Sequence, residues 1–249
     1  MGDWPAGVGR IVLPTTDSTM AEAARQAPTL AAPTWICALE QTAARGRRGR
    51  PWRSPPGNFA ASLVLRTGDA PGQAALRSFV AALALRDALA AVTGRPGALG
   101  LKWPNDVLLN GGKVAGILLE SVGQGARIDT LVIGVGVNLA GAPDAAELEP
   151  GAVSPVSLRG ETGLTITPEA FLDLLAPAYD GWERQFTTHG FAPIRAAWLQ
   201  GAVRLGQTIT ARTPRDETTG TFTDVDMAGH LVLQTVRGLQ RIAAADVFF

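Results

Sequence analysis

The side chains best placed to do chemistry lie in one short arginine-rich segment. Residues 43–52 read "AARGRRGRPW" and contain Arg45, Arg47, Arg48 and Arg50, with Gly46 and Gly49 between them. A guanidinium forms bidentate hydrogen bonds to carboxylates and phosphates, and glycine lets a ligand approach the backbone closely. The segment therefore predicts a loop that closes over a small anionic ligand. A solvated basic loop without a role is the alternative.

A second constellation is "KWPNDVLLNGGK", in which Lys102 and Lys113 flank a predicted hairpin. Its "WPND" turn offers Asn105 and Asp106, and a carboxylate together with phosphate oxygens suits Mg²⁺. The pattern indicates cations held against an anion, with Asp106 as a candidate metal ligand. The alternative is a capped hairpin whose lysines stand there by chance.

The segment "GVGVN", residues 134–138, has two glycines near the expected end of a strand, which predicts close approach of another group. It is a poor dinucleotide fingerprint, because the third glycine is absent and no helix is expected after it. The sequence also has no P-loop pattern. A bound nucleotide therefore needs a different architecture.

These segments are separated by elements that would position them. An oxygen-bearing cap at 17–19 predicts a helix start, and Gly94 predicts the end of a long helix over 71–93. Two further helices are expected at 168–186 and 191–199. Strands are expected at 34–41, at 58–66, in a hairpin series through 99–121 with an Asn-Gly turn at 110–111, and over 129–140. The apolar last strand is expected to be central.

The pattern changes near residue 201, where short alternating strands separated by Gly or Asp turns begin. We therefore expect a catalytic domain over 1–200 and a small β domain over 201–249. An apolar content of 46% is enough for a core. No signal peptide or membrane span is expected, since the longest apolar segment is interrupted by Arg86 and Asp87.

Composition excludes several functions. Lys plus Arg and Asp plus Glu are both 22, whereas a general nucleic-acid binder carries a basic excess. The single cysteine, Cys37, forms no internal disulfide, lies in an apolar run and is expected to be a buried structural thiol in a reducing compartment. His189 and His230 are too few for a multi-histidine metal site.

Three motifs in one order carry a resemblance to a known family: "GRRGRPWRSPPGN", "KWPNDVLLNGGKVAGILLE" and "VIGVGVNL", preceded by "DST" at 17–19. Together they resemble biotin–protein ligases, and the resemblance extends over essentially the whole chain. It implies an α+β fold of the class II aminoacyl-tRNA synthetase/biotin–lipoate ligase type, a mixed sheet flanked by helices and followed by a small SH3-like β-barrel. Because "DST" begins at residue 17, the form without a DNA-binding domain is expected, with no repressor activity and no DNA partner.

The resemblance implies that ATP activates biotin to biotinyl-5′-AMP and that biotin then passes to a lysine of a carboxylase's biotin carboxyl carrier domain. Biotin, ATP and Mg²⁺ are the small molecules implied, in a cytoplasmic enzyme, and a homodimer is left open. The implied biotin-binding residues are Ser18, Thr19, Gln41, Arg45, Gly46, Arg47, Lys113 and Gly116.

Within the implied site, Arg47 and Arg50 would hold the acyl-phosphate, and Lys113 would touch the biotin carboxylate and the α-phosphate. The remaining ATP or adenylate residues are Trp52 and Asn138 near the adenine and, for ATP and Mg²⁺, Asn105 and Asp106. Two positions depart from the family's pattern. Ala44 replaces a usual glycine, and Met20 replaces a frequent asparagine.

Three other functions are compared with this one. A lipoate or octanoate ligase, or the related acyltransferase, would use a similar domain without a urea-binding set. A nucleic-acid-binding module is disfavoured by zero net charge. A protein that only sequesters biotin would not need Lys113 and Asp106.

Overall fold

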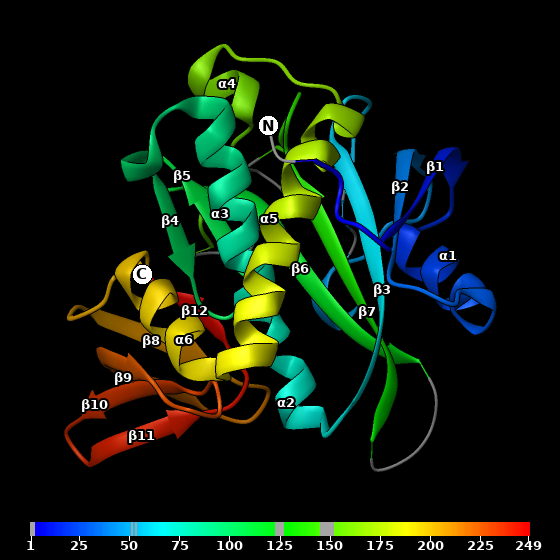
Figure 1. Ribbon diagram of the computed structural model, residues 1–249. Helices are drawn as coiled ribbons and strands as arrows, with labels where there is room; N and C mark the ends of the chain where they lie inside the picture. Colours follow the sequence, from blue (N-terminus) through cyan, green and yellow to red (C-terminus); the bar gives the residue numbers. More distant parts are fainter. Residues whose placement is uncertain (1–2, 51, 53, 123–126, 145–151) are drawn as a thin grey trace.

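The computed structural model describes residues 3–50, 52, 54–122, 127–144 and 152–249, which form two sheets and their helices (Figure 1). The larger sheet has seven strands in the order β1-β2-β3-β7-β6-β5-β4. Its strands are β1 Gly9–Thr16, β2 Thr34–Gln41, β3 Phe59–Asp69, β4 Leu99–Lys102, β5 Asp106–Leu109, β6 Gly112–Val122 and β7 Ile128–Val137. β1 and β2 are parallel and the other neighbours are antiparallel. β7 is the middle strand, as its apolar sequence predicted.

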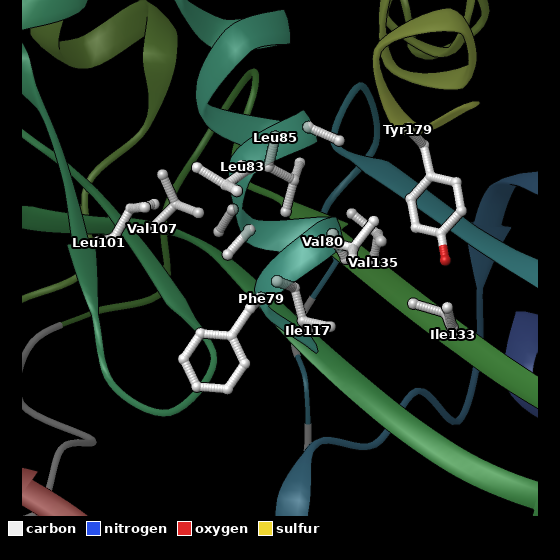
Figure 2. Close-up of a cluster of buried hydrophobic side chains, with 14 of the residues drawn as sticks. Phe79, Val80, Leu83, Leu85, Leu101, Val107, Ile117, Ile133, Val135 and Tyr179 are labelled. Atoms are coloured by element: carbon white, nitrogen blue, oxygen red, sulfur yellow. The ribbon is translucent and has the colours of Figure 1, made fainter. Parts of the chain in front are cut away.

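Helices cover both faces of this sheet, which is why its central strands are apolar on both sides. α1 (Thr19–Gln26) lies on one face, and α3 (Arg77–Thr93) and α5 (Pro168–His189) lie on the other. Alternation along β2 divides the two cores: Trp35 packs in the cluster of α3 and α5, and Ile36 packs with α1. Figure 2 shows the larger core, where Phe79, Leu83 and neighbours on α3 meet strand residues such as Ile117.

The helix expected over 71–93 is divided at Leu76 into α2 (Pro71–Ala75) and α3. The Leu76 N–H donates to the Gln73 carbonyl and the Leu76 carbonyl accepts from Phe79, so the chain tightens locally to a three-residue spacing. Gly94 ends α3 with φ 64°, as predicted.

The hairpin signal at 110–111 is also confirmed. Asn110 and Gly111 have φ values of 50° and 85°, which a two-residue turn between β5 and β6 requires. β1 and the short helix α4 (Leu158–Thr162) were not predicted.

The C-terminal part forms a five-stranded antiparallel sheet in the order β11-β10-β9-β8-β12. Its strands are β8 Thr208–Arg212, β9 Glu217–Val225, β10 Leu231–Thr235, β11 Gly238–Ile242 and β12 Asp246–Phe248. The predicted fold class, a mixed sheet flanked by helices with a small β domain after it, is confirmed. The boundary at residue 200 stays a prediction.

The small sheet is attached directly to the larger one. The Leu101 N–H donates to the Gly201 carbonyl at 2.8 Å, and the Trp103 Nε1–H donates to the Gly229 carbonyl at 3.0 Å. α6 (Phe191–Gln200) lies between the helix layer and the small sheet. These contacts bring β12 close to the strand ends that carry the predicted site. Among the described helices, none combines the length and apolarity that crossing a membrane requires.

Candidate functional site

Every residue that the motifs predicted for the site lines one cavity of about 530 Å³. The predicted residues in its wall are Ser18, Thr19, Gln41, Arg45, Gly46, Arg47, Arg50, Trp52, Asn105, Asp106, Lys113, Gly116 and Asn138. They come from the start of α1, the end of β2, the arginine loop that follows it, the β5–β6 hairpin and the end of β7. Segments as much as 120 residues apart in sequence are therefore brought to one place. Pro51 and Arg53 of the predicted loop motif lie outside the described residues.

At one end of the cavity, hydrogen bonds fix which groups Thr19 and Gln41 can offer a ligand. The Ser62 hydroxyl donates to Thr19 Oγ1 at 2.9 Å, and the Thr19 N–H donates to Gln41 Oε1 at 2.8 Å. Because the Thr19 oxygen accepts from Ser62, its own proton is left to donate into the cavity. The Gln41 carbonyl oxygen is likewise occupied, so its amide donors remain. This end is thus prepared for a ligand that accepts hydrogen bonds.

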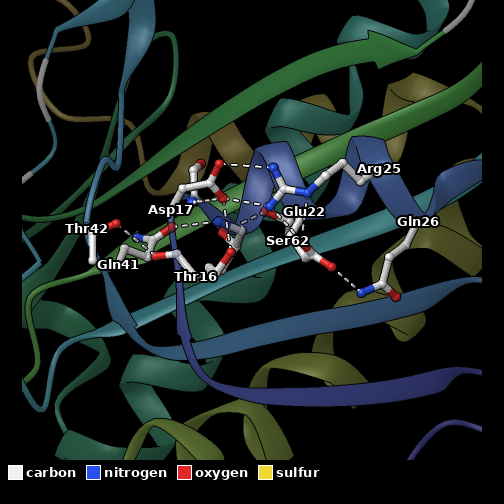
Figure 3. A network of polar contacts seen from close by, with 10 residues as sticks. Thr16, Asp17, Glu22, Arg25, Gln26, Gln41, Thr42 and Ser62 are labelled. Atoms are coloured by element: carbon white, nitrogen blue, oxygen red, sulfur yellow. Dashed lines mark hydrogen bonds and ion pairs between the residues drawn. The ribbon is translucent and has the colours of Figure 1, made fainter.

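A network of ion pairs on the outer side of this end of the cavity holds its residues in place (Figure 3). Asp17 accepts from the Ser18 N–H at 2.7 Å and pairs with Arg25 at 2.7 Å, and Arg25 also pairs with Glu22. Hydrogen bonding from Arg25 and then from Ser18 holds the pKa of the Asp17 carboxyl well below its usual range. Asp17 therefore stays ionised and fixes the turn that carries Ser18 and Thr19.

The centre of the cavity holds a carboxylate between two lysines. Lys113 Nζ lies 2.7 Å from Asp106 Oδ1, and Lys102 Nζ lies 3.7 Å from Asp106 Oδ2. Burial lowers the pKa of Lys102. Burial would raise the pKa of Asp106, but the charges of Lys113 and Lys102 hold it below its ordinary value. Asp106 is therefore an anion that positions two cations.

The arginine side chains of the loop point in two different directions. The Arg45 side chain is half exposed and points to Glu120 at 3.7 Å, so only its backbone is suited to the predicted role. Arg47, Arg48 and Arg50 point instead to Asp246 on β12, at 3.8, 2.7 and 3.0 Å. Burial lowers the pKa of Arg47, yet a guanidinium remains charged at neutral pH. The loop thus presents Arg47 and Arg50 at the cavity.

Trp52 explains the second glycine of "GVGVN", Gly136. A Cβ on Gly136 would lie 2.7 Å from Trp52 Cε2, and one on Gly116 would lie 3.3 Å from Trp52 Cζ3, so the indole rests on both strands where they have no side chain. Lys113 Nζ lies 5.7 Å from the centre of this ring. Trp52 was predicted near the adenine and Gly116 at the biotin pocket, whereas the structure places these two residues in contact.

The two predicted asparagines are held firmly in place. The Asn138 side chain is buried and donates to the Val156 carbonyl at 3.1 Å. Asn105 donates to the Ile117 carbonyl at 2.5 Å and accepts from Arg47 at 3.5 Å. Asn105 therefore links the arginine loop to β6 across the cavity.

The structure accommodates both departures from the family's pattern, Met20 and Ala44. Met20 is buried, and a Cβ on Gly134 would lie 2.4 Å from its sulfur, so Met20 fills the cavity floor and offers no hydrogen bond there. In the described part of the loop, positive φ occurs at Arg48 and Gly49, and Ala44 is not among such residues. Alanine at position 44 is therefore accommodated without backbone strain.

Motif reasoning missed three residues of this site. Lys102 was seen only as a flank of the hairpin, but it is buried in the cavity wall. Ser62 and Asp246 lie in strands with no recognisable motif, and only their contacts with Thr19 and the arginines reveal them. No group of three or more His, Cys, Asp or Glu residues suited to a metal occurs among the described residues.

Comparison with known proteins gives matches over most of the chain. The profile of the Biotin/lipoate A/B protein ligase family matches residues 10–138, and that of the Biotin protein ligase C terminal domain matches residues 205–249. The chain is 57% identical over 238 residues to the Biotin--[acetyl-CoA-carboxylase] ligase of Paracoccus denitrificans, covering 96% of this chain and 99% of that protein. It is 34% identical to the Bifunctional ligase/repressor BirA of Bacillus subtilis, covering 86% of this chain and 65% of that protein.

Solved structures agree on the fold. The biotin protein ligase from Aquifex aeolicus in complex with biotin and ATP superposes with a TM-score of 0.80 at 24% identity, covering 96% of this chain and 98% of that one. The biotin protein ligase from Leishmania major in complex with biotinyl-5-AMP superposes with a TM-score of 0.66 at 21% identity, covering 96% of this chain and all of that one.

Proposed function

Because the chain belongs to the biotin/lipoate A/B protein ligase family, we propose that it activates biotin with ATP and transfers it to a lysine of a biotin carboxyl carrier domain. In the first half-reaction, a biotin carboxylate oxygen attacks the α-phosphate, and pyrophosphate leaves. In the second, the lysine amine attacks the acyl carbon of biotinyl-5′-AMP, an amide forms and AMP leaves.

The observation that carries this proposal is the convergence of the motif residues on one cavity with cations at its centre and rim. The first half-reaction brings a carboxylate against a polyphosphate, so its barrier is dominated by charge repulsion. In this proposal Lys113, which Asp106 holds at 2.7 Å, lies between the two anions. Arg47 and Arg50 would hold the phosphate of the product, and the enclosing loop would keep water from the activated acyl group.

Biotin recognition is assigned to the end of the cavity where Thr19 and Gln41 present donors. The oxygen of a ureido group accepts hydrogen bonds, and a buried one needs donors that are already aimed. The Ser62–Thr19 bond of 2.9 Å and the Thr19–Gln41 bond of 2.8 Å supply that orientation before ligand arrives. A simple acyl chain or a dithiolane would leave these donors without partners, which disfavours octanoate and lipoate.

Mg²⁺ belongs to the proposal as the ion that accompanies ATP. Asp106, expected as its ligand, has Lys113 at 2.7 Å and Lys102 at 3.7 Å, so a divalent cation there would face two ammonium groups. As placed, Asp106 does not suit the metal, and no step of the proposed reaction depends on a metal ion at this carboxylate. Titrating Mg²⁺ against the ATP-free protein tests this point, because tight binding that Asp106→Asn abolishes would restore the predicted role.

The decisive experiment is ATP–pyrophosphate exchange measured with biotin, lipoate and octanoate, followed by transfer of biotin to a carrier domain. We expect exchange that depends on biotin alone, and transfer to one lysine of the carrier. Exchange with lipoate or octanoate instead would reassign the substrate. Binding of biotin without any ATP–pyrophosphate exchange would indicate that the protein only sequesters biotin.

Two further expectations accompany the proposal. A reducing, cytoplasmic place of action suits a chain with the single cysteine Cys37, and fractionation of cells tests it. Pairing of subunits through an edge strand such as β1 would give a homodimer, which sedimentation with and without biotin and ATP would detect.

A further inference from the structure

The proposed reaction gives no role to the buried side chain of Met20 in the wall of the cavity. Met20 is 4% exposed and follows Thr19 directly at the start of α1. A Cβ on Gly134 would lie 2.4 Å from its sulfur, so the thioether occupies the space that this glycine leaves open on β7. A ligand that passes over this part of β7 therefore meets a methionine.

The register of the strands shows where this methionine lies relative to the two ends of the cavity. Gly134 is paired with Ser62 on β3 and with Leu118 on β6, so these three positions form one row, here the first row, on the same face of the sheet. Ser62 leads to the donor end of the cavity, because its hydroxyl donates to Thr19. Met20 lies on the middle position of the first row.

A second row on the same face leads to the charged centre of the cavity. Two residues further along β7, Gly136 is paired with Gly116 on β6, which is paired with Asp106 on β5. Asp106 in turn holds Lys113 at 2.7 Å. Rows two residues apart along a strand are separated by about 7 Å. A ligand that reaches from the donor end of the cavity to Lys113 therefore passes from the first row to the second beside Met20.

Biotin placed in this way brings its sulfur-bearing ring to Met20, an assignment that rests on the proposed function. The ureido group would be at Thr19 and the carboxylate at Lys113. The thiophane ring is fused directly to the ureido ring, so it is the part of the ligand that occupies the first row, and the acyl chain continues to the second. The thioether of the ligand then packs against the thioether of Met20, and both groups are apolar and polarisable.

The described side chains of the first row offer no hydrogen-bond donor to an oxygen on that ring. The Ser62 hydroxyl gives its proton to Thr19, and the side chains of Met20 and Leu118 have none to give. Met20 also belongs to the smaller apolar core with residues such as Val132, so packing fixes its position. A sulfone oxygen buried here would lose its hydrogen bonds to water without replacement, which weakens binding by about 10- to 100-fold.

We propose that Met20 is a specificity-determining residue, which makes the site select biotin with an unoxidised sulfur and reject biotin sulfone. It acts by contact with the ring and takes no part in transfer of the acyl group. Glutamine has nearly the same length and shape as methionine but carries an amide donor. Met20→Gln should therefore accept the sulfone, whereas Met20→Leu, which stays apolar, should reject it as the native protein does.

Calorimetric titration with biotin and with biotin sulfone, in the absence of ATP, measures the ratio of the two dissociation constants. We expect the sulfone to bind about 10- to 100-fold more weakly to the native protein and to Met20→Leu, and the ratio to be at least about fivefold smaller for Met20→Gln. Met227→Gln, which changes a methionine that is 57% exposed, is the matched control and should leave the ratio unchanged. The affinity of 2-iminobiotin relative to biotin should not respond to these variants, because that analogue differs only at the ureido end.

Met20→Ala covers the case in which the glutamine variant does not fold. It leaves room for a water molecule to donate to the sulfone oxygen, so it should lower the ratio in the same direction. Equal affinity of the native protein for biotin and its sulfone would overturn the proposal without any variant, and so would a native ratio in folded Met20→Gln or Met20→Ala. Failure of the native protein to bind biotin at all would instead refute the proposed function.

Discussion

Replacing Lys113 by methionine isolates the charge that the proposed first half-reaction depends on. Methionine keeps most of the side-chain length, so the change removes one ammonium group beside Asp106 and little volume. Losing one preorganised charged donor at a developing transition state costs about 10²- to 10³-fold in rate, or about 3–4 kcal/mol. Biotin carries a single charge, and in the proposed site its ureido end makes most of the hydrogen bonds, so its affinity should fall by less than about tenfold.

The same substitution has a stability signature whose sign follows from Asp106. Its folded-state pKa is depressed, so its pairing stabilises the native state above the unfolded pKa and is lost as pH falls through the folded value. Lys102 remains at 3.7 Å, so we expect a loss of about 1–3 kcal/mol in the free energy of unfolding, less than for a fully broken buried pair. The difference in free energy of unfolding between the variant and the native protein should reach its full size above about pH 5 and become smaller below about pH 4.

Biotin-dependent ATP–pyrophosphate exchange, calorimetric binding of biotin and urea melts at several pH values measure these effects together. Arg184→Met, which removes a cation from an exposed helical pair with Asp180, is the matched control and should change none of them. Exchange at the native rate in Lys113→Met would refute the assignment of this lysine. A loss of biotin affinity as large as the loss of exchange rate would show that Lys113 stabilises bound biotin and not specifically the transition state.

Three other substitutions and one labelling experiment test separate parts of the structure. Arg47→Gly should speed release of preformed biotinyl-5′-AMP, and unchanged release in a stopped-flow assay would remove this arginine from the loop's function. Ser62→Ala removes the bond that orients the Thr19 hydroxyl, so biotin affinity should fall by about 5- to 20-fold with Thr19 still present; calorimetry that finds equal affinity would contradict the hydrogen-bond direction. Arg77→Met leaves two partly buried carboxylates without their cation and should lower the free energy of unfolding by about 1–3 kcal/mol in urea, whereas a loss near zero would show that water solvates both carboxylates equally well. Cys37 is buried and its thiol pKa is raised to about 12, so a thiol reagent at pH 8 should label it only on unfolding; rapid labelling of native protein would show that the strand opens.

Local sequence was enough to predict most of the fold, for reasons visible in particular elements. The Asn-Gly pair at 110–111 fixes a hairpin because its backbone angles suit few other residues, and Gly94 ends α3 for the same reason. β1 was missed because its burial alternates only weakly and its partner is parallel, which leaves no turn signal. The break at Leu76 was missed because Ala74, Ala75 and Arg77 around it favour a helix.

The site separates what sequence determines from what only tertiary structure decides. Through their resemblance to biotin–protein ligases, the motifs named thirteen of the residues that line the cavity. They could not reveal that Ser62 orients Thr19, that Trp52 rests on Gly116, or that Asp246 anchors the arginine loop. Each of those contacts joins residues more than forty positions apart, and the energy of such a contact depends on distance and burial in the folded chain. The amino-acid sequence therefore determines which chemical groups are available, and the packing of the two sheets decides which of them come into contact.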